Sequence, residues 1–306
     1  MIRTVKLPRV KKEYMNNSKV ANYISSNNEL LEKTIQLTTI PKKNVFVTVD
    51  LTADKKLFLT NSDITQYDMA VMDSVYTLYV NGVTSFSPEM VVRIMSGNFE
   101  QDVKVHKLEE VNKSLKKLSL IRITIDCTEE LLARRKIKKG KTLTLTSYLM
   151  PLREIEVQSA NYKAVTKGYQ LLEKPVLYTY AENVKQIMSV PTSLLETNIS
   201  DTDEAVILKR TLIKRIETMK NDKNRMNSNI IIYERVDKNT GKKKGFFKTL
   251  GYNEENYSNW KKKKLTIHRT ILSILDNFVA EKYIKGYEVI KEGKQKIIGI
   301  SICYDM

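Results

Sequence analysis

The sequence is poor in the residues that metal sites and disulfide frameworks need. It holds two cysteines, Cys127 and Cys303, and two histidines, His106 and His268, among 306 residues. The cysteines lie far apart in strand-like segments, where a cysteine is usually a small buried hydrophobe, so we expect a reducing, cytoplasmic setting. No Cys/His cluster has zinc spacing. We therefore expect no metal and no cofactor.

Long apolar runs are also missing. Membrane association would need about 20 consecutive apolar residues, a strongly amphipathic basic helix or a lipidation motif, and none is convincing here. The basic start, residues 1–17, has no apolar core and does not resemble a secretory signal. We expect no membrane partner.

Enzyme motifs are incomplete. Gly140-Lys141-Thr142 imitates the end of a P-loop, but the first glycine of that motif would have to stand at Arg135. A rolling-circle nickase would need a His-x-His metal pair, which the sequence lacks. Asp201-Thr202-Asp203 stands at a predicted helix start, where capping explains it better than a metal does. His268 falls at the edge of an apolar stripe, as structural histidines do. We expect a protein that is not an enzyme.

Positive charge is what the sequence has in excess. Its 52 Lys and Arg outnumber 35 Asp and Glu, which gives a formal net charge of +17. A field of that sign attracts polyanions, and with a membrane set aside the better partner is nucleic acid. The chain is about twice the length of a usual single domain, so we expect two domains, each with its own core.

Three helices in a row are predicted in the first half of the chain. Thr65–Asp68 resembles a capping box with Asp in place of Glu, and Asn81-Gly82 ends the helix that it opens. Ser87-Pro88 opens a short second helix, and a third begins near Val105. Strand-like alternation follows at 121–125, 143–146 and 155–157, with the basic segment 133–141 between the first two.

The second half repeats this order. A helix over 202–219 precedes an apolar run at 230–233, a short glycine-bounded helix at 245–251 and a long helix over 258–283. Two strand-like segments, 287–290 and 296–302, then form a hairpin. We expect the long helix to bury one apolar stripe, formed by Leu265, Leu272, Leu275, Phe278 and Val279.

Helices followed by a hairpin are the layout of a winged helix. The expected fold class is therefore α+β, with two tandem winged helix-turn-helix domains, mostly helical with small β-hairpin wings, related as a diverged repeat. We expect a basic N-terminal arm at 1–40, winged-helix domain 1 at 41–185 and winged-helix domain 2, the main DNA reader, at 186–306.

The second helix of a helix-turn-helix reads base edges in the major groove. On the 258–283 helix the predicted reading face is Lys262, Thr266 and Arg269, and Arg269 is the first candidate for a guanine contact. Lys261, Lys263 and Lys264 are expected to contact phosphates. The alternative is a solvated helix start, but positive charge there opposes the helix dipole and is better explained by an external anion.

Both expected wings are basic. In the second domain the wing lysines are Lys291, Lys294 and Lys296, which could instead guard a strand edge. In the first domain the candidate recognition face is Lys107, Lys113, Ser114 and Lys117, weakened by Glu109 and Glu110. Its expected wing is Arg134, Arg135, Lys136, Lys138, Lys139 and Lys141.

Several of these segments resemble the replication initiator (Rep) proteins of plasmids and integrated mobile elements. The matching segments are 59–60, 65–79, 86–90 and 95–97, and Leu275–Phe278 and Lys282–Tyr287 near the C-terminus. The resemblance implies that tandem winged helices bind direct repeats of double-stranded DNA at an origin and recruit host replication proteins such as a helicase or initiator. It also implies a homodimer that represses its own gene.

Two other functions stay open. A winged-helix transcriptional regulator would carry the same modules and would bind one inverted repeat over a promoter. A nuclease or primase accessory with a hidden active site would cleave origin DNA with a divalent metal.

Overall fold

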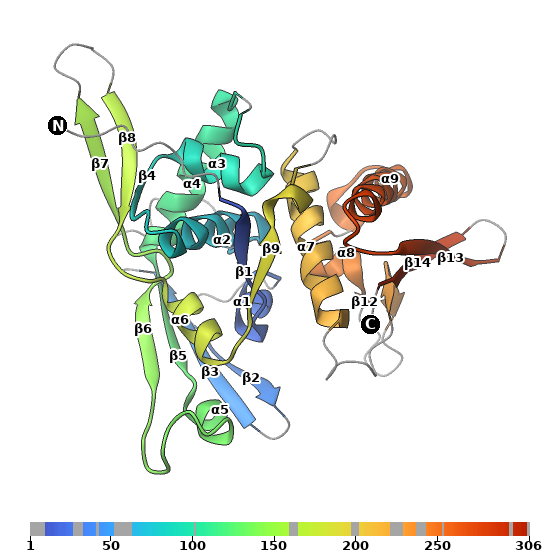
Figure 1. Cartoon of the computed structure of the whole chain (residues 1–306). Helices are drawn as coiled ribbons and strands as arrows, with labels where there is room; N and C mark the ends of the chain where they lie inside the picture. Colours follow the sequence, from blue (N-terminus) through green and yellow to red (C-terminus); the bar gives the residue numbers. More distant parts are fainter. Residues whose placement is uncertain are drawn as a thin grey trace. The chain divides into compact units, whose positions relative to one another are not determined.

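The computed structural model describes residues 10–26, 33–40, 43–51, 63–100, 102–158, 165–196, 202–220, 229–236, 243–252, 254–293 and 296–304. The chain is α+β and divides into two compact units, unit 1 (Met1–Thr192) and unit 2 (Ser193–Met306) (Figure 1). Within the described ranges, no helix combines the length and the apolar character needed to cross a bilayer.

Local capping signals set the helices of unit 1. Helix α2 (Gln66–Val80) begins at the expected capping box, in which the Thr65 side chain accepts from the Asp68 backbone and the Asp68 carboxylate accepts from the Thr65 backbone. Helix α3 (Pro88–Ser96) begins after Ser87 and ends at Gly97, which has a left-handed φ of 71°. Helix α4 (Val105–Leu120) follows. The three helices predicted from the sequence are confirmed.

The strands of unit 1 form two larger sheets. Strand β4 (Ser85–Phe86) pairs with β8 (Val165–Leu171), which pairs with β7 (Leu152–Gln158), all antiparallel. A second, four-stranded sheet has the order β2-β3-β5-β6. Its strands and the two nearby helices are β2 (Lys33–Ile40), β3 (Lys43–Leu51), β5 (Ile121–Asp126), β6 (Thr144–Tyr148), α5 (Thr128–Ala133) and α6 (Val176–Asn183).

The expected basic arm at 1–40 differs from the structure. Strand β1 (Lys12–Asn16) pairs antiparallel with β9 (Ile187–Pro191), and helix α1 (Lys19–Ile24) follows it. Met15 and Ile24 are fully buried. The sequence did not show this because the partner strand of β1 lies more than 170 residues away. The same pairing extends unit 1 beyond the expected boundary at residue 185, to Thr192.

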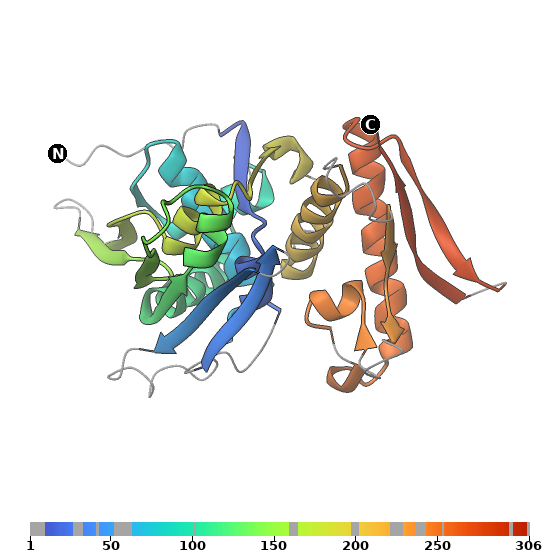
Figure 2. The same ribbon diagram turned by 90° about the horizontal axis from the view of Figure 1, so that it is seen from below.

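Unit 2 is built around its longest helix, α9 (Trp260–Ala280). Helix α7 (Asp203–Lys220), strand β10 (Ile230–Ile232) and the short helix α8 (Phe246–Thr249) precede it. The hairpin of β13 (Gly286–Glu292) and β14 (Lys296–Cys303) follows it and lies beside it in Figure 2. The minor elements of unit 2 are β11 (Arg235–Val236), β12 (Lys243–Lys244) and η4 (Glu254–Asn256), and η2 (Thr192–Leu194) spans the boundary between the units.

The buried stripe of α9 is rotated from the expected one. Leu275 and Phe278 are buried as predicted, but Leu265 is 45% exposed. The helix carries two overlapping apolar tracks, and the packed one is Trp260, Ile267, Ile271, Ile274, Leu275 and Phe278, together with His268. The prediction for Leu265 is wrong because tertiary packing, and not periodicity alone, selects the track.

The two units share one topology. Each contains, in this order, a helix, a short strand, two helices and a hairpin, and in unit 1 β5, α5 and β6 are inserted before the hairpin. In each unit the short strand, β4 or β10, pairs with the last strand of the hairpin, in the orders β4-β8-β7 and β10-β14-β13. The pairing of Phe86 with Tyr169 in unit 1 corresponds to that of Ile231 with Ile300 in unit 2. In both units a glycine stands directly before the hairpin residue of this pair, because the facing strand passes close to it. A Cβ on Gly168 would lie 3.2 Å from the Phe86 carbonyl oxygen, and a Cβ on Gly299 would lie 2.3 Å from the Ile231 carbonyl oxygen.

Candidate nucleic-acid interface

An aromatic cluster fixes the start of α9 against α8. The Tyr233 ring stacks on Phe247 of α8 with centroids 4.8 Å apart, and Phe247 meets the Trp260 ring edge-on at 5.8 Å. Tyr257 stacks on Trp260 with centroids 5.6 Å apart. Pairs of this kind add about 0.5–1.5 kcal/mol each beyond area burial. The short helix predicted at 245–251 is confirmed as α8, and its Phe247 packs against Trp260, the first residue of α9.

His268 belongs to this packing. Its Nδ1 lies 2.7 Å from the Tyr233 hydroxyl oxygen, and its side chain is buried among the apolar residues of α9. Burial lowers the pKa of His268 below its ordinary value, so the ring is neutral near pH 7. It is the structural histidine that the sequence predicted.

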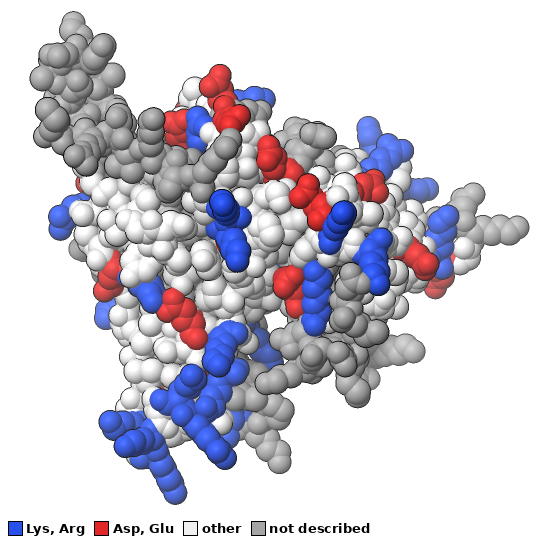
Figure 3. Space-filling model, in the orientation of Figure 1, with Lys and Arg blue, Asp and Glu red and all other residues white. Residues whose placement is uncertain are grey.

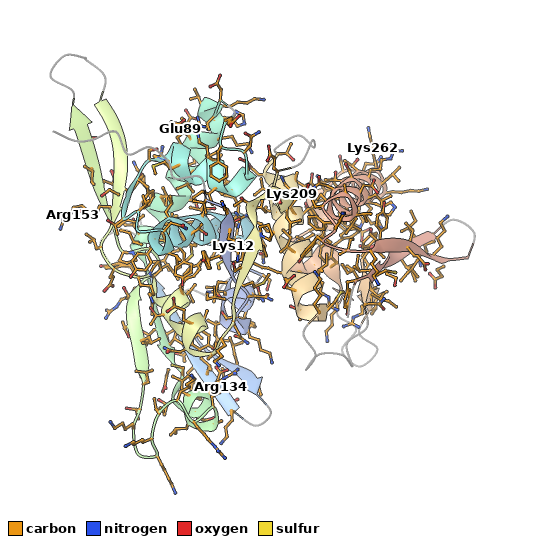
Figure 4. The ribbon with its side chains drawn as sticks, in the orientation of Figure 1. Lys12, Glu89, Arg134, Arg153, Lys209 and Lys262 are labelled. Atoms are coloured by element: carbon orange, nitrogen blue, oxygen red, sulfur yellow. The ribbon has the colours of Figure 1, made fainter. Side chains whose placement is uncertain are left out.

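The N-terminal half of α9 carries an exposed face opposite this cluster. Lys261, Lys262, Leu265, Thr266 and Arg269 are all exposed, and Figure 4 shows Lys262 pointing away from the ribbon. The Asn259 side chain caps the helix by accepting from the Lys262 backbone N–H at 3.0 Å. The predicted reading residues thus lie together on one open face, and Leu265 joins them although the sequence placed it in the core.

Two of the expected phosphate lysines have protein partners instead. Lys263 donates to Glu204 of α7, with 2.8 Å between Nζ and Oε1, and lies over the rings of Tyr252 and Tyr257. Lys264 donates to Glu234 at 2.9 Å. These two side chains tie α9 to its own unit, while Lys261 and Lys262 face solvent.

The β13–β14 hairpin carries the expected wing lysines of unit 2. Lys291 is exposed on β13. Lys296 donates to the Glu292 carboxylate at 2.5 Å, and this hydrogen bond lowers the pKa of Glu292. Lys294 lies outside the described residues.

Helix α4 presents fewer cations than predicted. Ser114 is buried and donates to the Asp68 carboxylate at 2.6 Å. Lys117 also donates to Asp68, and its side chain is only 15% exposed. Lys113 is exposed and pairs with Glu110, and Lys107 is partly buried. The placement of Ser114 and Lys117 on a DNA-reading face is wrong, because they face α2 along the same side of α4 as Val111 and Leu118.

The basic segment Arg134–Lys141 lies, as predicted, in the connection between two antiparallel strands, β5 and β6, and α5 forms the first part of that connection. The hairpin of unit 1 that corresponds in topology to β13–β14 is β7–β8. Figure 3 shows the cations of the basic segment as a blue group at the bottom of unit 1. Arg134 pairs with buried Glu130 at 2.8 Å. Arg135, Lys136, Lys138, Lys139 and Lys141 are exposed.

No protein-family model and no curated protein sequence matches the chain. Among solved structures, it is similar to a selenomethionine derivative of domain 2 and domain 3 of RctB. That likeness has 10% identity and a TM-score of 0.44, over 96% of this chain and 92% of the other. A second crystal structure of RctB domains 2–3 gives 9% identity and a TM-score of 0.42, over 96% and 91%.

Proposed function

We propose that this chain is a double-stranded DNA-binding replication initiator, built from two winged helix-turn-helix units, and that it is not an enzyme. The observation that carries the proposal is the exposed face of α9, on which Lys261, Lys262, Thr266 and Arg269 lie. In this proposal α8 and α9 form the helix-turn-helix, with α9 as its second helix. The β13–β14 hairpin beside α9 takes the place of a wing.

The chemistry of this face suits the major groove. An α-helix fits that groove, and an arginine can hydrogen-bond both acceptors of a guanine. Arg269 is assigned that role, Lys261 and Lys262 contact phosphates, and Thr266 bonds a base edge. Leu265 lies among them, where it can contact a thymine methyl group.

The repeated topology favours an initiator over a single-module binder. Two units in one chain suit neighbouring segments of a repeated site, and the resemblance to plasmid Rep proteins points to direct repeats at an origin. In this proposal the protein acts in the cytoplasm, forms a homodimer and recruits a host helicase or initiator. A winged-helix transcriptional regulator is the second candidate, because the same α9 face would serve it equally.

A footprint separates the two candidates. The purified chain is incubated at stated salt with the DNA that flanks its own gene, and protection is mapped by nuclease cleavage. An initiator protects several direct repeats beside an AT-rich stretch, whereas a regulator protects one inverted repeat over a promoter. Cleavage of that DNA by the purified chain with a divalent metal would contradict the assignment as a non-enzyme.

A further inference from the structure

The four-stranded sheet of unit 1 has one covered face and one open face. On the covered face Val47 and Val49 of β3 meet Ile123 and Ile125 of β5, and all four are fully buried. The alternate residues of the same strands point to the other side. There the side chains of all four strands are exposed or partly exposed.

Threonines and aromatic rings dominate the open face. Thr34, Thr48, Thr124 and Thr146 form one row across all four strands. The outer pairs share hydrogen bonds, at 2.8 Å between the Thr34 and Thr48 hydroxyls and 3.1 Å between those of Thr146 and Thr124. Phe46 is 37% exposed and Tyr148 is 41% exposed. Exposed Arg122 is the direct neighbour of Tyr148.

The two rings are placed to act on one extended ligand. Phe46 stands opposite Asp126 and Tyr148 opposite Arg122, so the rings are four residues apart along β5 and on the two strands that flank it. At the usual strand rise and spacing this places them roughly 16 Å apart. They are too distant to stack on each other, so each offers a separate platform to the same ligand.

Cations gather at the end of the sheet where Phe46 lies. Arg135, Lys136, Lys138, Lys139 and Lys141 belong to the connection that leads into β6, and in the part of the chain that the structure describes none of them forms an ion pair. Among the described residues, the two nearby carboxylates accept from backbone N–H groups and do not pair with these cations. Asp126 accepts from the Thr128 N–H and Glu129 from the Asn44 N–H, each at 3.0 Å.

We propose that this open face binds single-stranded nucleic acid. Phe46 and Tyr148 stack on bases, the threonine hydroxyls and Arg122 bond base edges and sugars, and the five cations contact phosphates. A duplex does not fit this chemistry, because its bases are stacked on each other and hide their faces from the rings. The site lies in unit 1 and is separate from the α9 face of the proposed function.

The test measures fluorescence anisotropy of a labelled oligo(dT) of about 12 nucleotides, within the usual site size, on the full chain. The variant Phe46→Leu/Tyr148→Leu keeps apolar bulk but removes the aromatic faces. Its matched control, Phe46→Tyr/Tyr148→Phe, keeps both rings. At about fivefold per lost stacking contact, we expect the leucine pair to weaken binding by about 25-fold and the control to bind like the unaltered protein.

The cations give a second readout. Changing Lys138, Lys139 and Lys141 to Gln should reduce the slope of log affinity against log salt by about two, at roughly 0.7 per cation on a single strand. Circular dichroism melting of each variant checks that unit 1 is folded. The same titration with oligo(rU) shows whether the site prefers RNA or DNA. Binding of either oligonucleotide that the leucine pair weakens supports the site.

Two results would overturn the proposal. The first is no binding of either oligonucleotide, and the second is equal binding by the leucine pair. If Arg269→Ala also loses oligonucleotide binding in the second case, the strand lies on α9. Failure of duplex binding alone would count against the proposed function and leave this test intact.

Discussion

Replacing the adjacent lysines Lys262 and Lys263 of α9 by glutamine should affect DNA binding in the first case and stability in the second. Lys262 is exposed, whereas Lys263 donates to Glu204 at 2.8 Å and its side chain is 25% exposed. If α9 contacts duplex DNA, Lys262→Gln removes one phosphate contact and lowers the slope of log affinity against log salt by about 0.9. Between about 50 and 200 mM salt, the unaltered protein should therefore lose about 3.5-fold more affinity than Lys262→Gln.

Lys263→Gln should leave that slope unchanged, because its charge is already neutralised within unit 2. It should instead lower the free energy of unfolding by about 0.5–1 kcal/mol, since solvent screens a partly exposed pair. Binding is measured by anisotropy of a labelled duplex over a salt series, and stability by urea denaturation. An equal loss of slope in both variants would refute the division of the two lysines.

Three further outcomes are expected for Gly299, His268 and Leu265 of unit 2. Gly299→Ala should destabilise unit 2 by about 1–3 kcal/mol, because its Cβ would meet the Ile231 oxygen at 2.3 Å, whereas Gly168→Ala at 3.2 Å should cost less in urea denaturation. Equal losses would contradict the difference in fit. Folding lowers the pKa of His268, so the free energy of unfolding should fall as the pH drops below about 6.5, by up to about 1.4 kcal/mol per pH unit. In urea denaturation at several pH values, His268→Gln should show a weaker dependence on pH. Replacing contacted thymines by deoxyuridine should weaken duplex binding about fourfold, at about 0.8 kcal/mol per methyl, and Leu265→Ala should abolish the difference; an unchanged difference would remove Leu265 from the reading face.

Helix ends were predictable because their signals are local. The Thr65–Asp68 box, Ser87-Pro88 and Gly97 lie within one turn of the ends that they set. The same holds for the order of elements in unit 2, including the short α8.

Long-range partners were not predictable from periodicity. Lys117 has the spacing of an exposed lysine, but its partner Asp68 lies on another helix, 49 residues earlier. The pairing of the strands on either side of the basic segment Arg134–Lys141 was predictable, whereas the short helix α5 in their connection was not. The exposed face of α9 was predicted in large part, since Lys262, Thr266 and Arg269 avoid both apolar tracks, whereas Leu265 belongs to the track that packing leaves exposed.

The central claim is that α9 reads duplex sequence through Arg269. The most direct measurement is the ratio of affinities for the footprinted duplex and a scrambled duplex, at one salt concentration, for the unaltered chain and Arg269→Ala. The account predicts that the ratio falls by about 5- to 150-fold, the equivalent of 1–3 kcal/mol, while scrambled-duplex binding changes little. An equal loss on both duplexes, or no loss on either, would contradict it.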